Sequence, residues 1–132
     1  MLLKEEITCF GEVLIDRFKN SDGTEQDAFG GAPANTAMGL AILDAPVSFI
    51  GKVGSDAAGD FLITELQKYG VSTEQVVVSP TEPTTVAFVA LTAEGERSFT
   101  FQEGAHSAIR PDEVSLPPYT AIFHFGSLTQ IL

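Results

Sequence analysis

Strand-like and helix-like segments alternate along most of this chain, and this alternation constrains its fold more than any other feature. Apolar runs typical of buried strands cover residues 7–11, 47–53 and 76–78. Between them lie a helix-like segment at about 34–43 and a second one with apolar positions within 58–69. Strands that alternate with helices form a parallel sheet layered by helices, so the sequence predicts an α/β body.

A predicted β-hairpin breaks this alternation. Residues 85–92 and 97–102 flank a turn at residues 93–96, a pattern typical of hairpins. We therefore expect a small antiparallel flap beside the body. Residues 19–27 are polar and turn-like, and residues 121–125 have the composition of a last buried strand.

Composition and charge exclude several classes of protein. The 132 residues are 44% hydrophobic and 19% charged, which suits one domain with a real core. The net charge is −11 and no Lys/Arg cluster interrupts it, so nucleic acid is not an expected partner. No apolar run approaches the roughly 18 residues of a membrane span. Glu5 and Glu6 stand where an export signal has basic residues, so we expect a cytoplasmic protein.

The cysteine and the histidines do not suggest a catalytic or metal site. Cys9 is the single cysteine and lies in an apolar segment, so we expect a buried, inert thiol. His106 and His124 are far apart, and no cysteine or carboxylate spacing around them resembles a metal site. We predict no metal-binding residue.

The segment from Gly30 to Asn35 resembles the start of a ligand-binding helix. Two glycines before a helix remove side chains that would hold a ligand away from the backbone. Pro33 fits the first helical turn, where its missing N–H is not needed. The amide of Asn35 can both donate to and accept from hydroxyl groups. A tight turn without a ligand is the alternative.

Two further features suggest a sugar site. Asp16 ends the apolar run after the first strand, where open α/β sheets bind ligands, and its carboxylate could accept two sugar hydroxyl protons. A solvated aspartate at a strand end is the alternative. Phe99 and Phe101 lie on one face of the flap, where they could cover a sugar, contact a second subunit or pack in the core.

Residues 51–60 form a second glycine-rich segment, which we do not interpret as a phosphate site. Gly54 and Gly59 have P-loop spacing, but Asp60 stands in the place of the lysine, where it would repel phosphate. The spacing also differs from that of a dinucleotide-binding domain. We interpret the segment as a turn followed by a helix cap at Ser55 or Asp56.

Five segments together resemble the ribokinase-like (PfkB) carbohydrate kinases. They are FGEVLID (10–16), GGAPANTA (30–37), FIGKVGSDAAG (49–59), TTVAFVALTAEGERSFTF (84–101) and FHFGS (123–127). They occur in family order along nearly the whole chain. The resemblance implies a ribokinase-like body, a partial parallel sheet with helices, that carries a small antiparallel β lid. The lid strands would lie within 12–30 and 84–103.

The resemblance also implies a sugar site between lid and body. Asp16, Gly31 and Asn35 would contact sugar hydroxyls, and Gly30 would shape the turn. The lid residues implied are Ala87, Phe99 and Phe101, in contact with the sugar or with a second subunit. Lids of this kind often pair between chains, which implies a homodimer.

Details favour a fructokinase-like member of the family. Glu12 and the Ala-Pro after the glycines are similar to fructokinases and related ketose or keto-sugar-acid kinases. Ribokinases tend to have Asn and Lys in place of Leu14 and Ala32. Fructokinases commonly continue with Tyr-Arg after Phe101, whereas this chain has Gln-Glu. Despite this departure at Gln102 and Glu103, the resemblance implies ATP-dependent phosphorylation of fructose or a related sugar.

The second signature of the family has no match in residues 1–132. It holds the aspartate that deprotonates the sugar hydroxyl and a Gly-Ala-Gly anion hole, in a C-terminal, ATP-binding half. We predict no catalytic or cofactor-binding residue in this chain, and ATP and Mg²⁺ are implied only for the intact enzyme. The chain is expected to be the sugar-binding part of a kinase or, alternatively, a catalytically inactive sugar-binding or dimerisation fragment.

Overall fold

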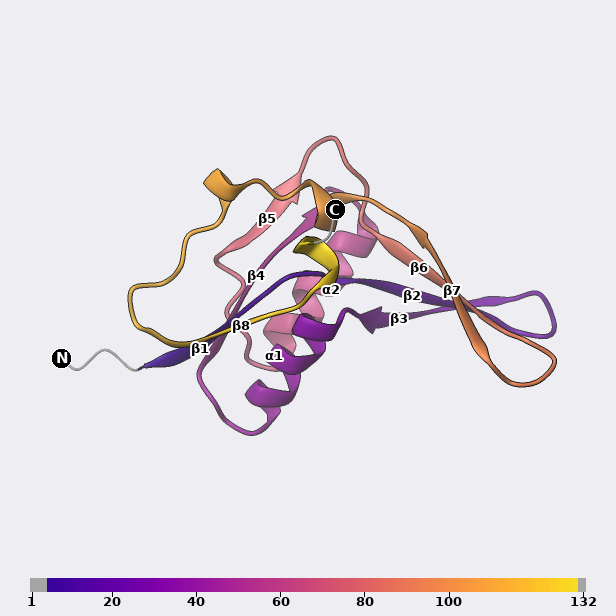
Figure 1. Ribbon diagram of the computed structural model, residues 1–132, viewed down its shortest axis with the longest axis horizontal. Coiled ribbons are helices and arrows are strands. Elements are labelled where there is room, and N and C mark those ends of the chain that lie inside the picture. The colour runs from indigo at the N-terminus through magenta and orange to yellow at the C-terminus, as the bar shows by residue number, and fades with distance from the viewer. Residues whose placement is uncertain (1–4, 131–132) are drawn as a thin grey trace.

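The computed structural model describes residues 5–130 and consists of two sheets and two main helices (Figure 1). Residues 1–4, part of the segment considered above for an export signal, lie outside the described residues. The body sheet has the order β5-β4-β1-β8, and every neighbouring pair is parallel. Its strands are β1 (Glu6–Phe10), β4 (Val47–Gly54), β5 (Val76–Ser79) and β8 (Thr120–Phe125). The predicted parallel α/β body is therefore confirmed.

The first helix, α1 (Ala32–Ile42), packs closely against β1 and β4. Its packing face is made of small residues, and Ala34 and Ala37 are fully buried. The helix begins two residues earlier than predicted, because Pro33 fits within its first turn. It ends before Asp44, which has a positive φ of 62°.

The second helix, α2 (Ala57–Lys68), starts at a carboxylate cap. The Asp56 side chain accepts a hydrogen bond from the Gly59 N–H at 2.8 Å. It also accepts bonds from the Thr84 N–H and hydroxyl, at 2.9 and 2.6 Å. Burial raises the pKa of Asp56, but these hydrogen bonds outweigh it and hold the pKa below its usual value. The interpretation of residues 51–60 as a turn and a cap is confirmed.

The second sheet is the lid, which projects from the body as two long hairpins (Figure 1). Its order is β3-β2-β6-β7, with both hairpins antiparallel. Its strands are β2 (Leu14–Lys19), β3 (Glu25–Gly30), β6 (Val86–Leu91) and β7 (Arg97–Gln102). The expectation of a wholly antiparallel lid is wrong, because β2 and β6 leave the body in the same direction and pair in parallel.

Two other segments differ from their predictions. The turn expected over residues 19–27 is shorter, because β3 begins at Glu25 and Arg17 holds Asp27 across the strands at 2.6 and 2.8 Å. The burial expected for residues 121–125 is wrong. Ile122 and Phe125 point to opposite faces of β8 and are 57% and 61% exposed, because the described residues cover neither face of this edge strand fully. An open hollow of about 480 Å³ borders the exposed aromatic side chains.

The remaining observations concern Cys9 and the helices. Cys9 is fully buried, and burial raises the pKa of its thiol to about 11, as expected for an inert cysteine. Within residues 5–130, no helix has the length and apolar character that crossing a membrane requires.

Candidate functional site

A pocket of about 340 Å³ lies where the lid meets the start of α1. Its lining includes six residues that the sequence singled out: Asp16, Gly31, Asn35, Ala87, Phe99 and Phe101. Segments far apart in the chain thus meet in one concave site, as ligand sites usually require. Four lining residues were not among the predicted site residues: Glu12, Leu14, Ala32 and Leu128.

The two glycines leave no room for side chains. Gly31 has a φ of +108°, and a Cβ on it would clash with the carbonyl oxygen of Glu12. A Cβ on Gly30 would lie 2.5 Å from Oδ2 of Asp16. Gly30 does not line the pocket itself; it keeps the space beside the Asp16 carboxylate free. Gly31 then starts α1, where its carbonyl accepts the Asn35 N–H at 2.8 Å.

Asp16 reaches the pocket from the lid, where it pairs with Ala28 on β3 and Ala87 on β6. Asp16 does end the apolar run after the first body strand, as expected, but it lies on the lid strand β2 and not at the edge of the body sheet. Burial raises the pKa of Asp16, and the positive charge of Arg97 opposes the shift. Asp16 is thus a partly desolvated carboxylate that faces a pocket.

Glu12 occupies the position that the sequence argument gave to Asp16. It follows Gly11 directly after β1, at the carboxyl edge of the parallel sheet, where open α/β folds bind ligands. Its side chain is buried, with 5% exposure, and Oε2 has no hydrogen-bond partner among the described residues. The signal that could have identified it is an acid placed immediately after the glycine that ends the first strand.

The lid contributes an apolar wall. Phe101 pairs with Ala87, which in turn pairs with Asp16, so three neighbouring strands present these residues in one row. Phe99 and Phe101 are 53% and 41% exposed, which excludes ordinary core packing. Two exposed aromatic rings beside one buried and one half-buried carboxylate suit a ligand that has both apolar and hydroxyl faces.

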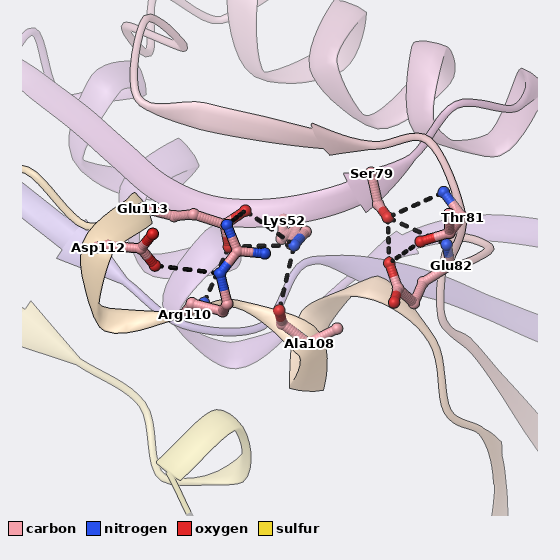
Figure 2. Close-up of polar contacts among 8 residues, drawn as sticks. All are labelled: Lys52, Ser79, Thr81, Glu82, Ala108, Arg110, Asp112 and Glu113. Carbon is pink, nitrogen blue, oxygen red and sulfur yellow. Dashed lines mark hydrogen bonds and ion pairs between the residues drawn. The ribbon is translucent and has the colours of Figure 1, made fainter.

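A second polar cluster lies outside this pocket, between β4 and the segment after the lid (Figure 2). Lys52 is its centre, and its Nζ donates to both carboxylate oxygens of Glu113 at 3.0 Å and to the Ala108 carbonyl at 3.1 Å. Arg110 donates to Asp112 at 3.1 Å, and Glu82 accepts from the hydroxyl of Thr81. Every ammonium hydrogen of Lys52 therefore has an acceptor.

The hollow around Lys52 does not fit an ATP–Mg²⁺ site. Lys52 and Arg110 are paired with carboxylates, and Glu82 lines the same hollow, so a triphosphate would meet negative charge there. Asp56 is engaged as a helix cap. No group of three His, Cys, Asp or Glu side chains within residues 5–130 is arranged to hold a metal ion.

His106 is buried beneath the lid. Its Nδ1 lies 2.6 Å from the Thr85 hydroxyl, just before β6, while Nε2 is buried without a partner among the described residues. Burial lowers the pKa of His106, against the negative charges of Glu103 and Glu12. The expectation that His106 has no metal role stays a prediction.

Comparisons with known proteins agree with this geometry. The chain is 38% identical to the probable fructokinase-6, chloroplastic, of Arabidopsis thaliana, across 95% of this chain and 35% of that protein. It superposes on a fructokinase from Xylella fastidiosa with a TM-score of 0.87 and 40% identity, across 95% of this chain and 42% of the other. A Xylella fastidiosa fructokinase with bound ATP matches with a TM-score of 0.78 and 40% identity, across 86% and 38%.

The chain spans well under half the length of the relatives it matches. The family profile described as pfkB family carbohydrate kinase nevertheless matches residues 4–130, nearly all of the chain. This match agrees with the parallel body, the lid and the pocket between them. The chain therefore belongs to the pfkB family of carbohydrate kinases.

Proposed function

We propose that this chain is the sugar-binding part of an ATP-dependent carbohydrate kinase, a phosphotransferase with an alcohol group as acceptor. The observation that carries the proposal is the pocket between lid and body. The pocket combines a partly desolvated carboxylate, a glycine directly before helix α1 and exposed aromatic side chains of the lid. The chain that contains it belongs to a sugar kinase family.

Each pocket residue has a proposed role. The Asp16 carboxylate accepts hydrogen bonds from two hydroxyls, and Asn35 can donate or accept beside it. Gly31 lets the sugar approach the backbone at the start of α1, and Gly30 keeps space beside Asp16. Ala87, Phe99 and Phe101 form the wall that covers the apolar face of the sugar.

Fructose or a closely related sugar is the proposed substrate. Relatives at 38% and 40% identity are called fructokinases, and the chain shares Glu12 and the Gly-Gly-Ala-Pro run with that type. Phosphoryl transfer, with ATP and Mg²⁺, belongs in this proposal to an intact enzyme. In this proposal residues 5–130 supply the sugar side, because Lys52 and Arg110, the two cations of the hollow around Lys52, are already paired with carboxylates.

A homodimer formed through the lid and a cytoplasmic location complete the proposal. β7 is an edge strand of the lid; its Phe99 is 53% exposed, and Leu91 on the neighbouring β6 is 70% exposed. Light scattering at micromolar concentration tests the dimer: Leu91→Asp should yield a monomer. A chain that is already monomeric without the substitution would contradict it.

Calorimetry with a panel of sugars tests the binding proposal. Wild type should bind fructose or a related ketose, and Asp16→Asn should bind it at least about 10-fold more weakly, since it removes a charge-assisted acceptor. Asp22→Asn, at an exposed lid turn, is the matched control and should bind like wild type. Equal affinity of wild type and Asp16→Asn would remove Asp16 from the site, and no binding by wild type would overturn the proposal.

A further inference from the structure

Three polar side-chain atoms in residues 5–130 are buried without a hydrogen-bond partner: Glu12 Oε2, His106 Nε2 and Thr129 Oγ1. Buried polar groups are almost always paired, so each of these atoms needs an explanation. Only Glu12 also lines the pocket between lid and body. Of the three residues, Glu12 is therefore the one whose carboxylate belongs to the ligand site.

The backbone around Glu12 fixes its position. The Gly11 N–H donates to the Ile50 carbonyl at 3.1 Å, and the Gly126 N–H donates to the Phe10 carbonyl at 3.0 Å. Both bonds tie the chain on either side of the carboxylate to the central strands of the body. Backbone hydrogen bonds thus fix Glu12 at the carboxyl edge of the sheet. Its position does not require a hydrogen bond from its own side chain.

Two walls of the carboxylate offer no hydrogen-bond donor, and the nearby His106 imidazole makes no hydrogen bond with Oε2. A Cβ on Gly126 would lie 2.9 Å from Glu12 Oε2 and 2.9 Å from the Pro33 ring, so only glycine leaves this space. Proline has no N–H to donate. The described surroundings therefore form a fitted slot for the carboxylate but offer Oε2 no donor.

The pocket has a second notable property: both of its ionisable lining residues are acids. Glu12 and Asp16 line it, and no lysine or arginine does so among the described residues. Two carboxylates favour a ligand that donates hydrogen bonds at two places, and they oppose one that carries a carboxylate of its own.

We propose that Glu12 is a second carboxylate of the sugar site, a specificity-determining residue that accepts a hydrogen bond from a hydroxyl other than those bound by Asp16. The ligand class is then a neutral polyhydroxylated sugar and not a sugar acid. This inference rests on the proposed function, since it assigns a further contact in the same pocket.

A cycle of protein and ligand changes tests the contact. Fructose and its monodeoxy analogues are titrated into wild type and Glu12→Gln, with binding measured by calorimetry. Glu12→Gln should weaken fructose binding about 10-fold. For wild type, one deoxy analogue should bind about 10-fold more weakly than fructose. For Glu12→Gln, the same analogue and fructose should bind with equal affinity. Gluconate should bind wild type more weakly than fructose.

Glu103→Gln is the matched control. Glu103 is exposed and, like Glu12, acts electrostatically on the pKa of His106, but it does not line the pocket. It should leave both fructose affinity and the analogue pattern unchanged. Should Glu12→Gln fail to fold, Glu12→Asp, which retracts the carboxylate by one methylene, provides the same comparison.

The outcomes separate the two proposals. Loss of affinity that is equal for all analogues, or no loss at all, would overturn the role of Glu12. In the same cycle, Asp16→Asn should show coupling to a different sugar hydroxyl. If Asp16 shows this coupling and Glu12 shows none, the proposed function stands and this inference fails. Absence of sugar binding by wild type would overturn both.

Discussion

The Lys52 cluster and the lid–body pocket differ in how fully their polar groups are paired. In the cluster around Lys52, the ammonium group has three acceptors, and Arg110 and Glu113 bond each other as well as their neighbours. In the lid–body pocket, Glu12 Oε2 is buried without a partner, and burial raises the pKa of Asp16. Both regions contain buried charge, but only the pocket has unused hydrogen-bonding capacity.

This difference distinguishes a structural cluster from a binding site. A fully paired cluster joins segments, and Lys52 joins β4 to the segment around Ala108 and Glu113. An unpaired group is destabilising in the free protein and can be satisfied by a ligand. Substitutions should therefore have opposite effects on stability in the two regions, and this contrast can be measured.

The largest expected effect is on the Lys52 cluster. Lys52→Met should lower the free energy of unfolding by roughly 2 kcal/mol, because the Ala108 carbonyl loses its donor and Glu113 loses the buried one of its two cations. Urea unfolding followed by circular dichroism measures it. Asp112→Asn, which removes only an exposed partner of Arg110, should stay within about 0.5 kcal/mol of wild type. A change within about 0.5 kcal/mol for Lys52→Met as well would contradict the claim that the Lys52 cluster stabilises the fold.

Asp16→Asn should change stability in the opposite direction. Since the folded-state pKa of Asp16 is raised, its carboxylate destabilises the fold once the pH exceeds that pKa, and the difference vanishes below the ordinary value of 3.8. The variant should thus unfold at slightly higher urea than wild type at pH 7 and at the same urea in acid. A lower midpoint at pH 7 would show that Asp16 has a stabilising role.

His106 should give the chain a smaller, pH-dependent instability. Its folded-state pKa is lowered, so stability falls as the pH drops below the unfolded value of 6.5, where only the unfolded chain takes up the proton. Wild type should lose more stability between pH 7 and pH 5 than His106→Gln, with His124→Gln as the control. Parallel pH profiles for wild type and His106→Gln would exclude this role of the imidazole.

The smallest stability effect is expected at the lid. Phe99 is 53% exposed, so Phe99→Ala should change the free energy of unfolding by about 0.5 kcal/mol or less. Its effect on fructose affinity should be larger, because the ring loses its contact with the sugar. Thermal unfolding and calorimetry on the same sample compare the two. A large loss of stability with unchanged fructose affinity would show that Phe99 stabilises the fold and does not contact the sugar.

The sequence predicted the body of this fold better than its lid. The apolar run of β4 identified that strand because all of its residues are buried. The spacing of apolar residues identified α2, whose Leu62 and Leu66 are buried on one face. It did not locate β3, whose residues from Glu25 to Asp27 are polar and exposed on both faces. Strand direction within the lid depends on how β2 and β6 leave the body, which local sequence does not encode.

The candidate site was only partly predictable for a related reason. Glycine and amide chemistry singled out Gly31 and Asn35, and the resemblance to a family supplied the lid residues. Glu12 was missed as a site residue because its significance depends on what surrounds it in space. Its slot is formed by Gly126 and Pro33, which are 93 positions apart in the chain.

The most direct test of the central claim is an amide NMR titration of the chain with fructose. Shift changes should concentrate at pocket amides, Gly31, Ala32 and Asn35 among them, while amides of the Lys52 cluster such as Thr81, Ala108 and Arg110 stay unchanged. Changes that appear first in the Lys52 cluster, or no saturable change at all, would contradict the claim that the unpaired region is the sugar site.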